Sequence, residues 1–199
     1  MRLEDPFIDQ ILPTQPGIFL EKRSIQQTHL ITGRQIFSLN DERRWSMGVL
    51  NSLLSGGMSS RLFQNIRENH GVAYEIYSFA NLYRDTGVFG VYLATDPNKR
   101  RKALELIQTE LDKLKDAPVQ PAELERVKAQ YQSGFVMSEE SMERRMFRLG
   151  RQLIYYNVTM EIDEYLNRIE QVSSSEVQSL AQELFTPDAF LTMVLEPAN

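Results

Sequence analysis

The chain has 199 residues, of which 42% are hydrophobic and 25% charged, and its formal net charge is −5. This is the composition of a globular protein long enough to bury a core, and its acidic balance argues against nucleic-acid binding. The sequence contains no cysteine, which excludes disulfides, thiolate catalysis and cysteine zinc sites. It shows no apolar run of membrane-spanning length and no signal-peptide core, so cytoplasmic and periplasmic locations both stay open.

Residues 1–16 contain three of the eight prolines and have no clear periodicity. They predict a linker or arm, and a linker at this position suggests that another segment precedes it in a longer protein. Residues 17–199 are predicted to form a single domain.

The first predicted elements are strands over 17–23 and 28–37, where apolar residues alternate or cluster. The acidic stretch at 40–42 suits the positive end of a following helix. The buried stripe of that helix would consist of Trp45, Val49 and Leu53.

Gly56 and Gly57 are expected to end this helix in the left-handed conformation, and Ser59 or Ser60 would cap a short second helix that stops near 69–71. Strands over 72–83 and 87–95 follow, because both segments are rich in β-branched and aromatic residues. The turn between them predicts a β-hairpin.

Asp96, a capping residue before a proline, predicts a helix start, and helical patterns dominate from there to residue 185. One of these helices has an apolar stripe made of Met142, Met146, Leu149 and Leu153. Another begins with a capping box at 173–176, and a last strand is expected over 190–195. This order predicts an α+β fold, with an antiparallel sheet of about four to six strands covered on one face by helices.

The sequence does not contain the set of residues that a complete zinc site would need. A zinc peptidase site needs about three protein ligands, whereas the chain has two histidines, His29 and His70, far apart in the sequence. The favoured interpretations are a sheet-face residue for His29 and a helix-end neighbour for His70. The triplet at 85–87 matches that of aspartic proteases, but their chemistry needs two such carboxylates, and a turn explains the triplet.

Arg67 and Tyr74 lie seven residues apart across a predicted helix-to-strand junction. A guanidinium and a phenol near one turn can both donate to a carbonyl oxygen, which is what stabilises the oxyanion formed when water attacks a peptide. The same two residues also suit structural roles, because a cation is favourable at a helix C-terminus and tyrosine is common in strands.

The sequence resembles the C-terminal half of the pitrilysin/insulinase family of zinc metallopeptidases, in its bacterial processing-peptidase-like branch. The resemblance covers nearly the whole chain from Gly17. The segments that carry it are 57–64, 67–68, 71–74, 85–90, 95–97 and 172–197. In that family two α+β halves face each other, and the N-terminal half binds zinc through His-x-x-Glu-His.

The resemblance implies that this chain is the zinc-less half, with Arg67 and Tyr74 as the pair that reaches the substrate carbonyl. Gly56, Gly57 and Met58 would correspond to the family's glycine-rich, substrate-contacting segment. Zinc would then come from a separate half with His-x-x-Glu-His, the substrate would be a peptide or unfolded polypeptide, and this chain alone would be inactive. Self-association through the exposed partner surface is also expected. The alternative is an inactive scaffold or assembly subunit of the same family.

Overall fold

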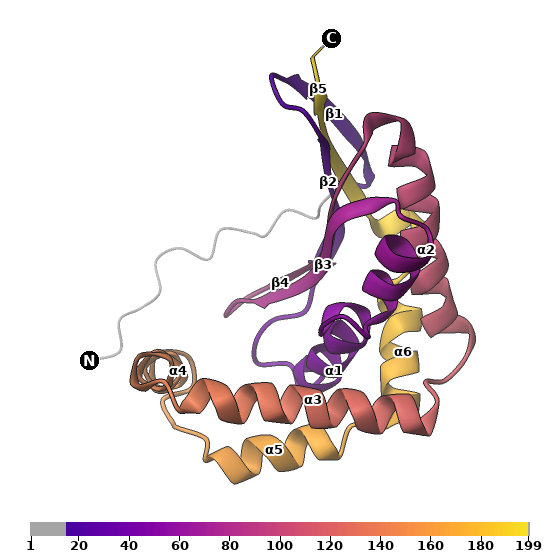
Figure 1. Ribbon diagram of the computed structural model, residues 1–199. Coiled ribbons are helices and arrows are strands. Elements are labelled where there is room, and N and C mark those ends of the chain that lie inside the picture. The colour runs from indigo at the N-terminus through magenta and orange to yellow at the C-terminus, as the bar shows by residue number, and fades with distance from the viewer. Residues whose placement is uncertain (1–14, 199) are drawn as a thin grey trace.

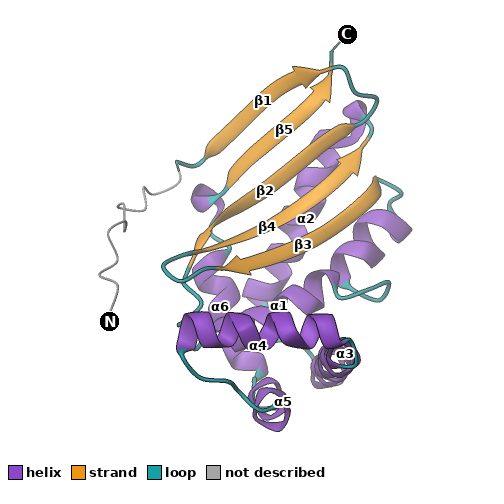
Figure 2. Ribbon diagram, turned by 90° about the vertical axis from the view of Figure 1, so that its left-hand side faces the viewer, coloured by secondary structure: helices purple, strands orange, loops and turns teal. Residues whose placement is uncertain are grey.

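The computed structural model describes residues 15–198, which form a five-stranded sheet with helices packed on one face (Figures 1 and 2). Most of the predicted linker at 1–16 therefore lies outside the described residues. The strand order across the sheet is β1-β5-β2-β4-β3. The strands are β1 (Gly17–Arg23), β2 (Thr28–Ile36), β3 (Ala73–Leu82), β4 (Gly87–Thr95) and β5 (Leu191–Pro197).

The sheet confirms the predicted α+β fold with helices on one face, and it is mixed where a fully antiparallel sheet was predicted. β2 pairs antiparallel with β4 and β5, and β3 and β4 form the predicted hairpin. β1 instead runs parallel to β5, from Gly17 opposite Leu191 to Arg23 opposite Pro197. The sequence could not show this pair, because the two strands lie at opposite ends of the chain.

The helices follow the predicted order. The α-helices are α1 (Arg44–Ser55), α2 (Arg100–Asp116), α3 (Pro121–Glu139), α4 (Met142–Tyr156), α5 (Ile162–Glu170) and α6 (Ser174–Leu184). A π-helix, η1 (Phe63–Asn69), and two 3-10 turns, η2 (Pro97–Lys99) and η3 (Pro187–Ala189), complete the set. Within residues 15–198, no helix combines the length and the apolar character that crossing a bilayer requires.

The core lies between the sheet and helices α1, α2 and α6, and strand periodicity selects its residues. Leu30 in β2 and its neighbours Leu93 in β4 and Val194 in β5 are fully buried on the helix-covered face. In β2, Gly33 lies opposite Gly90, and a Cβ on Gly33 would lie 2.5 Å from the Phe89 carbonyl oxygen. Glycine is needed there because any side chain would push the two central strands apart.

Helix caps were predicted with mixed success. Ser173 and Glu176 form the full capping box of α6. Gly56, however, ends α1 with φ −72°, and only Gly57 has a positive φ, of 134°. The predicted Ser caps are also wrong: the Ser59 hydroxyl accepts a bond from the Arg126 guanidinium, and the buried Ser60 hydroxyl has no partner among the described residues.

The acidic stretch at 40–42 does not cap α1 directly, because that helix begins at Arg44. The Asp41 carboxylate accepts bonds from the backbone N–H and the side chain of Arg43 in the turn before the helix. The predicted stripe of α1 is confirmed, since Trp45, Val49 and Leu53 are all buried.

The apolar stripe predicted for 142–153 is present but exposed. Helix α4 has no buried residue, and Met142, Met146 and Leu153 keep 78%, 63% and 54% of their surfaces exposed. The reason is the orientation of the helix, whose other side carries Arg148 in a two-point ion pair with Glu139, at 2.7 Å for each contact. The side of α4 that carries Arg148 therefore faces the protein, and the side that carries Met142 and Met146 faces outward.

Candidate functional site

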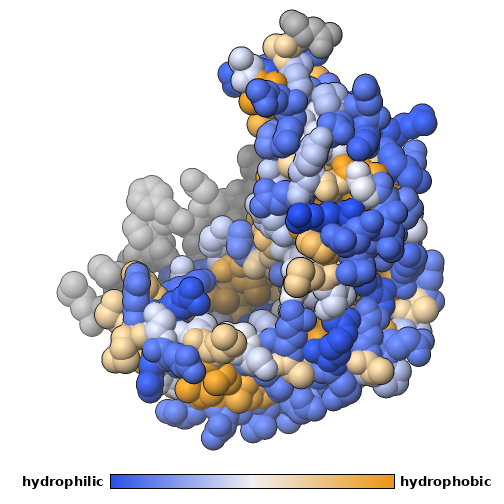
Figure 3. All heavy atoms as spheres, viewed as in Figure 1, coloured by the Kyte–Doolittle hydropathy of each residue, from blue (hydrophilic) through white to orange (hydrophobic). Residues whose placement is uncertain are grey.

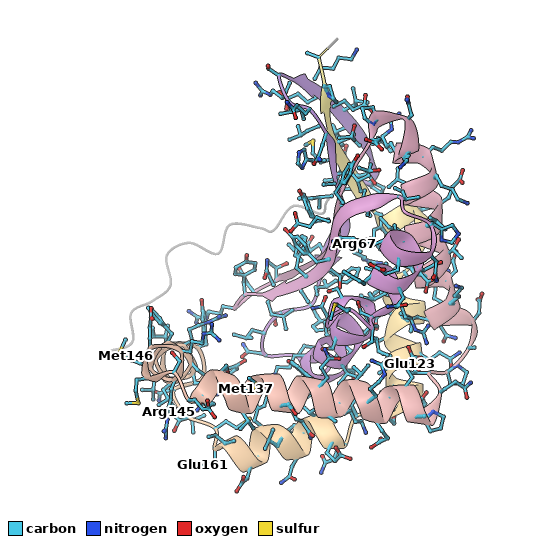
Figure 4. All side chains as sticks on the ribbon, in the orientation of Figure 1. Arg67, Glu123, Met137, Arg145, Met146 and Glu161 are labelled. Atoms are coloured by element: carbon cyan, nitrogen blue, oxygen red, sulfur yellow. The ribbon has the colours of Figure 1, made fainter. Side chains whose placement is uncertain are left out.

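The first part of the site is an irregular helix end. Residues 63–69 form a π-helix. Just after it, the Val72 N–H donates to the Ile66 carbonyl at 3.0 Å and the Gly71 N–H to the Arg67 carbonyl at 3.1 Å. Gly71 then takes φ +58°, which favours glycine. Single π turns are rare and often occur at functional sites. Here the π-helix places Arg67 in its last turn, exposed to solvent (Figure 4).

The second part is a strand irregularity three residues later. In the β3–β4 ladder Ala73 pairs with Thr95 and Glu75 with Ala94, which leaves Tyr74 as an unpaired extra residue. A bulge of this kind redirects a side chain and is frequent beside active sites. Tyr74 is 51% exposed, and its hydroxyl donates to Asp96 Oδ1 at 2.7 Å.

Asp96 and Lys99 connect the two irregularities. The Lys99 ammonium lies 3.2 Å from the Asp96 carboxylate and also donates to the Gly71 carbonyl at 3.2 Å. The hydrogen bond from Tyr74, followed by that from Lys99, lowers the pKa of the Asp96 carboxyl. The same bond and the negative charge of Asp96 raise the pKa of the Tyr74 phenol, so the phenol keeps its proton to higher pH than usual.

Asp96 is a site residue that the sequence analysis missed. It occupies the predicted cap position before Pro97, but its side chain makes no capping hydrogen bond and binds Tyr74 instead. An Asp-Pro pair signals a helix start in either case, so no local pattern distinguishes the two roles.

Arg67 is held differently from Tyr74. Its guanidinium stacks over the Phe63 ring, 4.9 Å from the centroid, and forms no ion pair within residues 15–198. Arg67 and Tyr74 flank Gly71, but no hydrogen bond joins their side chains in the described structure. Two exposed donors on either side of one turn can both approach an outside acceptor.

The segment Gly56–Met58 is tied to its surroundings through its backbone. The Gln130 side-chain amide of α3 donates to the Gly56 carbonyl, and the Gln64 amide donates to the Met58 carbonyl at 2.6 Å. Met58 itself is exposed. The structure places this segment just before η1 in the chain, and a contact with substrate stays a prediction.

The two histidines occupy separate structural positions. His29 Nδ1 lies 2.8 Å from the Tyr92 hydroxyl on the uncovered sheet face, and His70 Nδ1 lies 2.7 Å from the Asn65 carbonyl. Among residues 15–198 no three histidine, aspartate or glutamate side chains are grouped as metal ligands. Within residues 15–198 the side chains therefore do not form a set of zinc ligands. Asp85 lies in the hairpin turn, which the bond from the Tyr83 N–H to the Thr86 carbonyl closes at 2.8 Å.

Fold and sequence together define the class of this chain as the zinc-less half of a two-half peptidase. The family model described as peptidase M16 inactive domain matches residues 3–131, and the chain belongs to this family. The resemblance stated from the sequence is thereby confirmed.

Curated relatives of the chain are named as zinc proteases. It is 37% identical over 162 residues to an uncharacterized zinc protease of Streptomyces coelicolor, covering 81% of this chain and 35% of the relative. It is 35% identical over 178 residues to the uncharacterized zinc protease YmxG of Bacillus subtilis, covering 89% of this chain and 44% of the relative. The chain thus spans less than half the length of these relatives.

Solved structures share the fold at low sequence identity. A protease from Helicobacter pylori superimposes with a TM-score of 0.82 at 20% identity, over 92% of this chain and 44% of that one. A peptidase M16 inactive domain from Pseudomonas fluorescens gives 0.80 at 17% identity, over 96% and 46%. A chain of Complex III2 from Candida albicans gives 0.81 at 11% identity, over 91% and 46%.

Proposed function

We propose that this chain is the substrate-binding, zinc-less half of a zinc metalloendopeptidase and that Arg67 and Tyr74 contact the peptide carbonyl during cleavage. The observation that carries the proposal is the pair of backbone irregularities around Gly71. The π-helix ends with an exposed Arg67, and the bulge places Tyr74 half-exposed on the other side of the turn. The names of the relatives, as zinc proteases, support the reaction class.

Tyr74 would act as a neutral hydrogen-bond donor. Its raised pKa keeps the proton on the phenol through neutral and mildly alkaline pH. The hydroxyl is exposed, so a substrate carbonyl could replace Asp96 as its acceptor. Asp96 would meanwhile hold the ring in position in the absence of substrate.

Arg67 would supply a fixed positive charge beside the same carbonyl or the next one along the peptide. Its guanidinium carries no neutralising carboxylate within the described residues, and its stacking on Phe63 limits its motion. Gly56, Gly57 and Met58 would form a further edge of the substrate path. The zinc ion and its activated water would be supplied by a second half with His-x-x-Glu-His, because residues 15–198 offer no ligand group.

The first prediction concerns Tyr74 in the enzyme reconstituted with its zinc-bearing half. Tyr74→Phe removes one donor to the developing oxyanion and should lower kcat by about 10²–10³, with a smaller change in KM. Cleavage of an unfolded peptide is the measurement. Tyr83→Phe is the matched control, since Tyr83 is also exposed and directly follows the far end of β3. Wild-type turnover by Tyr74→Phe would remove this residue from the mechanism.

The second candidate function is a scaffold without a part in catalysis. The fold shared with a chain of Complex III2 shows that this architecture also occurs in an assembly that is not named as a peptidase. Mixing this chain with a zinc-bearing half separates the two candidates. Complex formation with no gain in cleavage over the zinc half alone would favour the scaffold, and a gain that depends on Tyr74 would favour the peptidase half.

A further inference from the structure

A cavity beside α4 takes no part in the proposed function. It has a volume of about 700 Å³, and its lining comes from α1, α3, α4, α5 and the end of β3. In Figure 3 a hollow with apolar atoms at its floor separates the α4 region from the rest of the molecule. Arg67 lies well away from α4 (Figure 4), so this α4 cavity is distinct from the site around Gly71.

Aromatic rings form much of the wall of the α4 cavity. They belong to Trp45, Tyr131, Phe147, Tyr155, Tyr156 and Tyr165. Trp45 and Tyr165 meet edge to face at 5.0 Å, and the Tyr131 and Tyr165 hydroxyls lie 3.2 Å apart. These contacts hold the rings in place, which provides fixed apolar surfaces for an aromatic or aliphatic side chain.

The same cavity concentrates positive charge in an acidic protein. Among the lining residues that the structure describes, four are arginines, namely Arg44, Arg144, Arg148 and Arg151, and one is a carboxylate, Glu143. Glu139 neutralises Arg148. Neither Arg144 nor Arg151 forms an ion pair with any residue that the structure describes. Counting the described residues alone, the α4 cavity therefore presents two guanidiniums without a carboxylate partner, although the whole chain has a net charge of −5.

Two donors deeper in the wall add to this polarity. The side chain of Arg44 is largely buried, stacks on the Trp45 ring at 4.7 Å and reaches Glu42 at 3.5 Å, a carboxylate that is itself mostly in solvent. The buried Trp45 indole N–H has no hydrogen-bond partner in the described part of the chain. Buried donors without acceptors are uncommon, so this indole N–H is an unsatisfied polar group in the wall beside the cavity.

The open side of the α4 cavity favours a chain over a small molecule as occupant. Phe147 and Val158 line it and yet remain 59% and 61% exposed. Pockets for small ligands enclose most of the ligand surface, whereas this site leaves a wide apolar rim.

We propose that the α4 cavity binds a polypeptide segment in which acidic residues stand next to aromatic or aliphatic ones. The carboxylates pair with Arg144 and Arg151, and the apolar side chains enter between the aromatic rings. Guanidinium–carboxylate pairs give this site its charge selectivity. The site does not require that the chain takes part in cleavage, because it shares no residue with the Arg67–Tyr74 pair.

The test is isothermal titration calorimetry of the 199-residue chain with an acetylated, amidated peptide of sequence Gly-Ser-Glu-Leu-Phe-Asp-Leu-Ser-Gly. The control peptide replaces its two acids by Gln and Asn. We expect the acidic peptide to bind at least about 10-fold more tightly, and the difference to shrink at high salt. Equal affinity for the two peptides would overturn the proposal.

The chain itself provides matched variants. Arg144→Gln and Arg151→Gln should each weaken binding of the acidic peptide by about 10-fold. Arg145→Gln removes the same charge from the same helix outside the cavity lining and should leave the affinity unchanged (Figure 4). All three side chains are exposed, so the variants should fold, which circular dichroism checks.

Three further outcomes decide the matter. If Arg145→Gln weakened binding of the acidic peptide as much as Arg151→Gln does, the effect would come from the overall charge of the helix, and the proposed site would be overturned. Binding of free 4-phenylbutyrate as tightly as the peptide would overturn the polypeptide as occupant. Unchanged peptide binding by Tyr74→Phe is expected, and it separates this site from the proposed catalytic one.

Discussion

At the residue scale, Tyr74 and Asp96 form a pair in which each partner changes the ionisation of the other. The Tyr74 hydroxyl donates to the Asp96 carboxylate, which raises the pKa of the phenol and lowers that of the carboxyl. The depressed pKa of Asp96 means that its stabilising contribution is present above the unfolded-state pKa and is lost as the pH falls through the folded-state pKa.

Asp96→Asn tests this pair. The substitution removes the acceptor charge that favours the neutral phenol, so the pKa of Tyr74 should fall towards its ordinary value. The measurement is the ultraviolet titration of tyrosinate, corrected by the same titration of Tyr74→Phe. Asp116→Asn, on α2 and exposed, is the control and should leave the titration unchanged. An unshifted Tyr74 in Asp96→Asn would show that the hydrogen bond is not maintained in solution.

Residue patterns alone identified Arg67 and Tyr74 as donors on either side of one turn, and the resemblance to a family gave them a role. The bulge at Tyr74 and the bond to Asp96 were not predictable, because both depend on which residue of β4 lies opposite each residue of β3. An unpaired residue shifts the inside–outside alternation of a strand by one position, but only Ala73 precedes the bulge in β3, so the sequence pattern contains too few residues to reveal the shift.

At the element scale, α3 and α4 show that two similar apolar patterns can have opposite environments. Leu124 in α3 is buried in the core, whereas Met146 in α4 is 63% exposed. The local sequence predicted both helices, because in each the apolar residues repeat at helical spacing. This periodicity shows that the apolar residues share one side of the helix, but it does not show whether that side faces the core or the solvent. In the structure, the side of α4 that faces the protein carries Arg148, which pairs with Glu139 of α3.

Truncation of the two side chains should therefore have unequal effects. Leu124→Ala should lower the free energy of unfolding by about 2–5 kcal/mol, since it leaves a cavity in the core. Met146→Ala should change it by less than about 0.5 kcal/mol, because the side chain already contacts water. Urea unfolding of both variants provides the comparison. If Met146→Ala lowered the free energy of unfolding as much as Leu124→Ala does, α4 would have to pack against another surface in solution.

At the scale of the whole molecule, the uncovered face of the sheet carries a continuous apolar row. The strand register places its members side by side across all five strands (Figure 2). They are Phe19, Met193, Ile31, Tyr92 and Tyr77, in that order. Contiguous apolar surface of this kind is typical of a face that another protein covers, and the expected self-association of the isolated chain stays a prediction.

Ile31→Lys tests the role of this face. A charge at the centre of the row should shift a self-associated chain towards monomer in sedimentation velocity experiments at high protein concentration. Val136→Lys is the matched control, because Val136 is comparably exposed on α3, away from the sheet. Equal behaviour of the two variants would exclude the open sheet face as the contact.

Local sequence patterns were sufficient to predict the order and the approximate bounds of the elements, the capping box of α6 and the position of the Arg67–Tyr74 pair beside a turn. These features depend on neighbours within a few residues, so local patterns contain them. Four features became visible only in the folded chain: the parallel β1–β5 pair, the outward stripe of α4, the α4 cavity and the apolar row on the sheet. Each of these depends on contacts between residues distant in the chain, and local periodicity does not encode which distant partner a given side will meet.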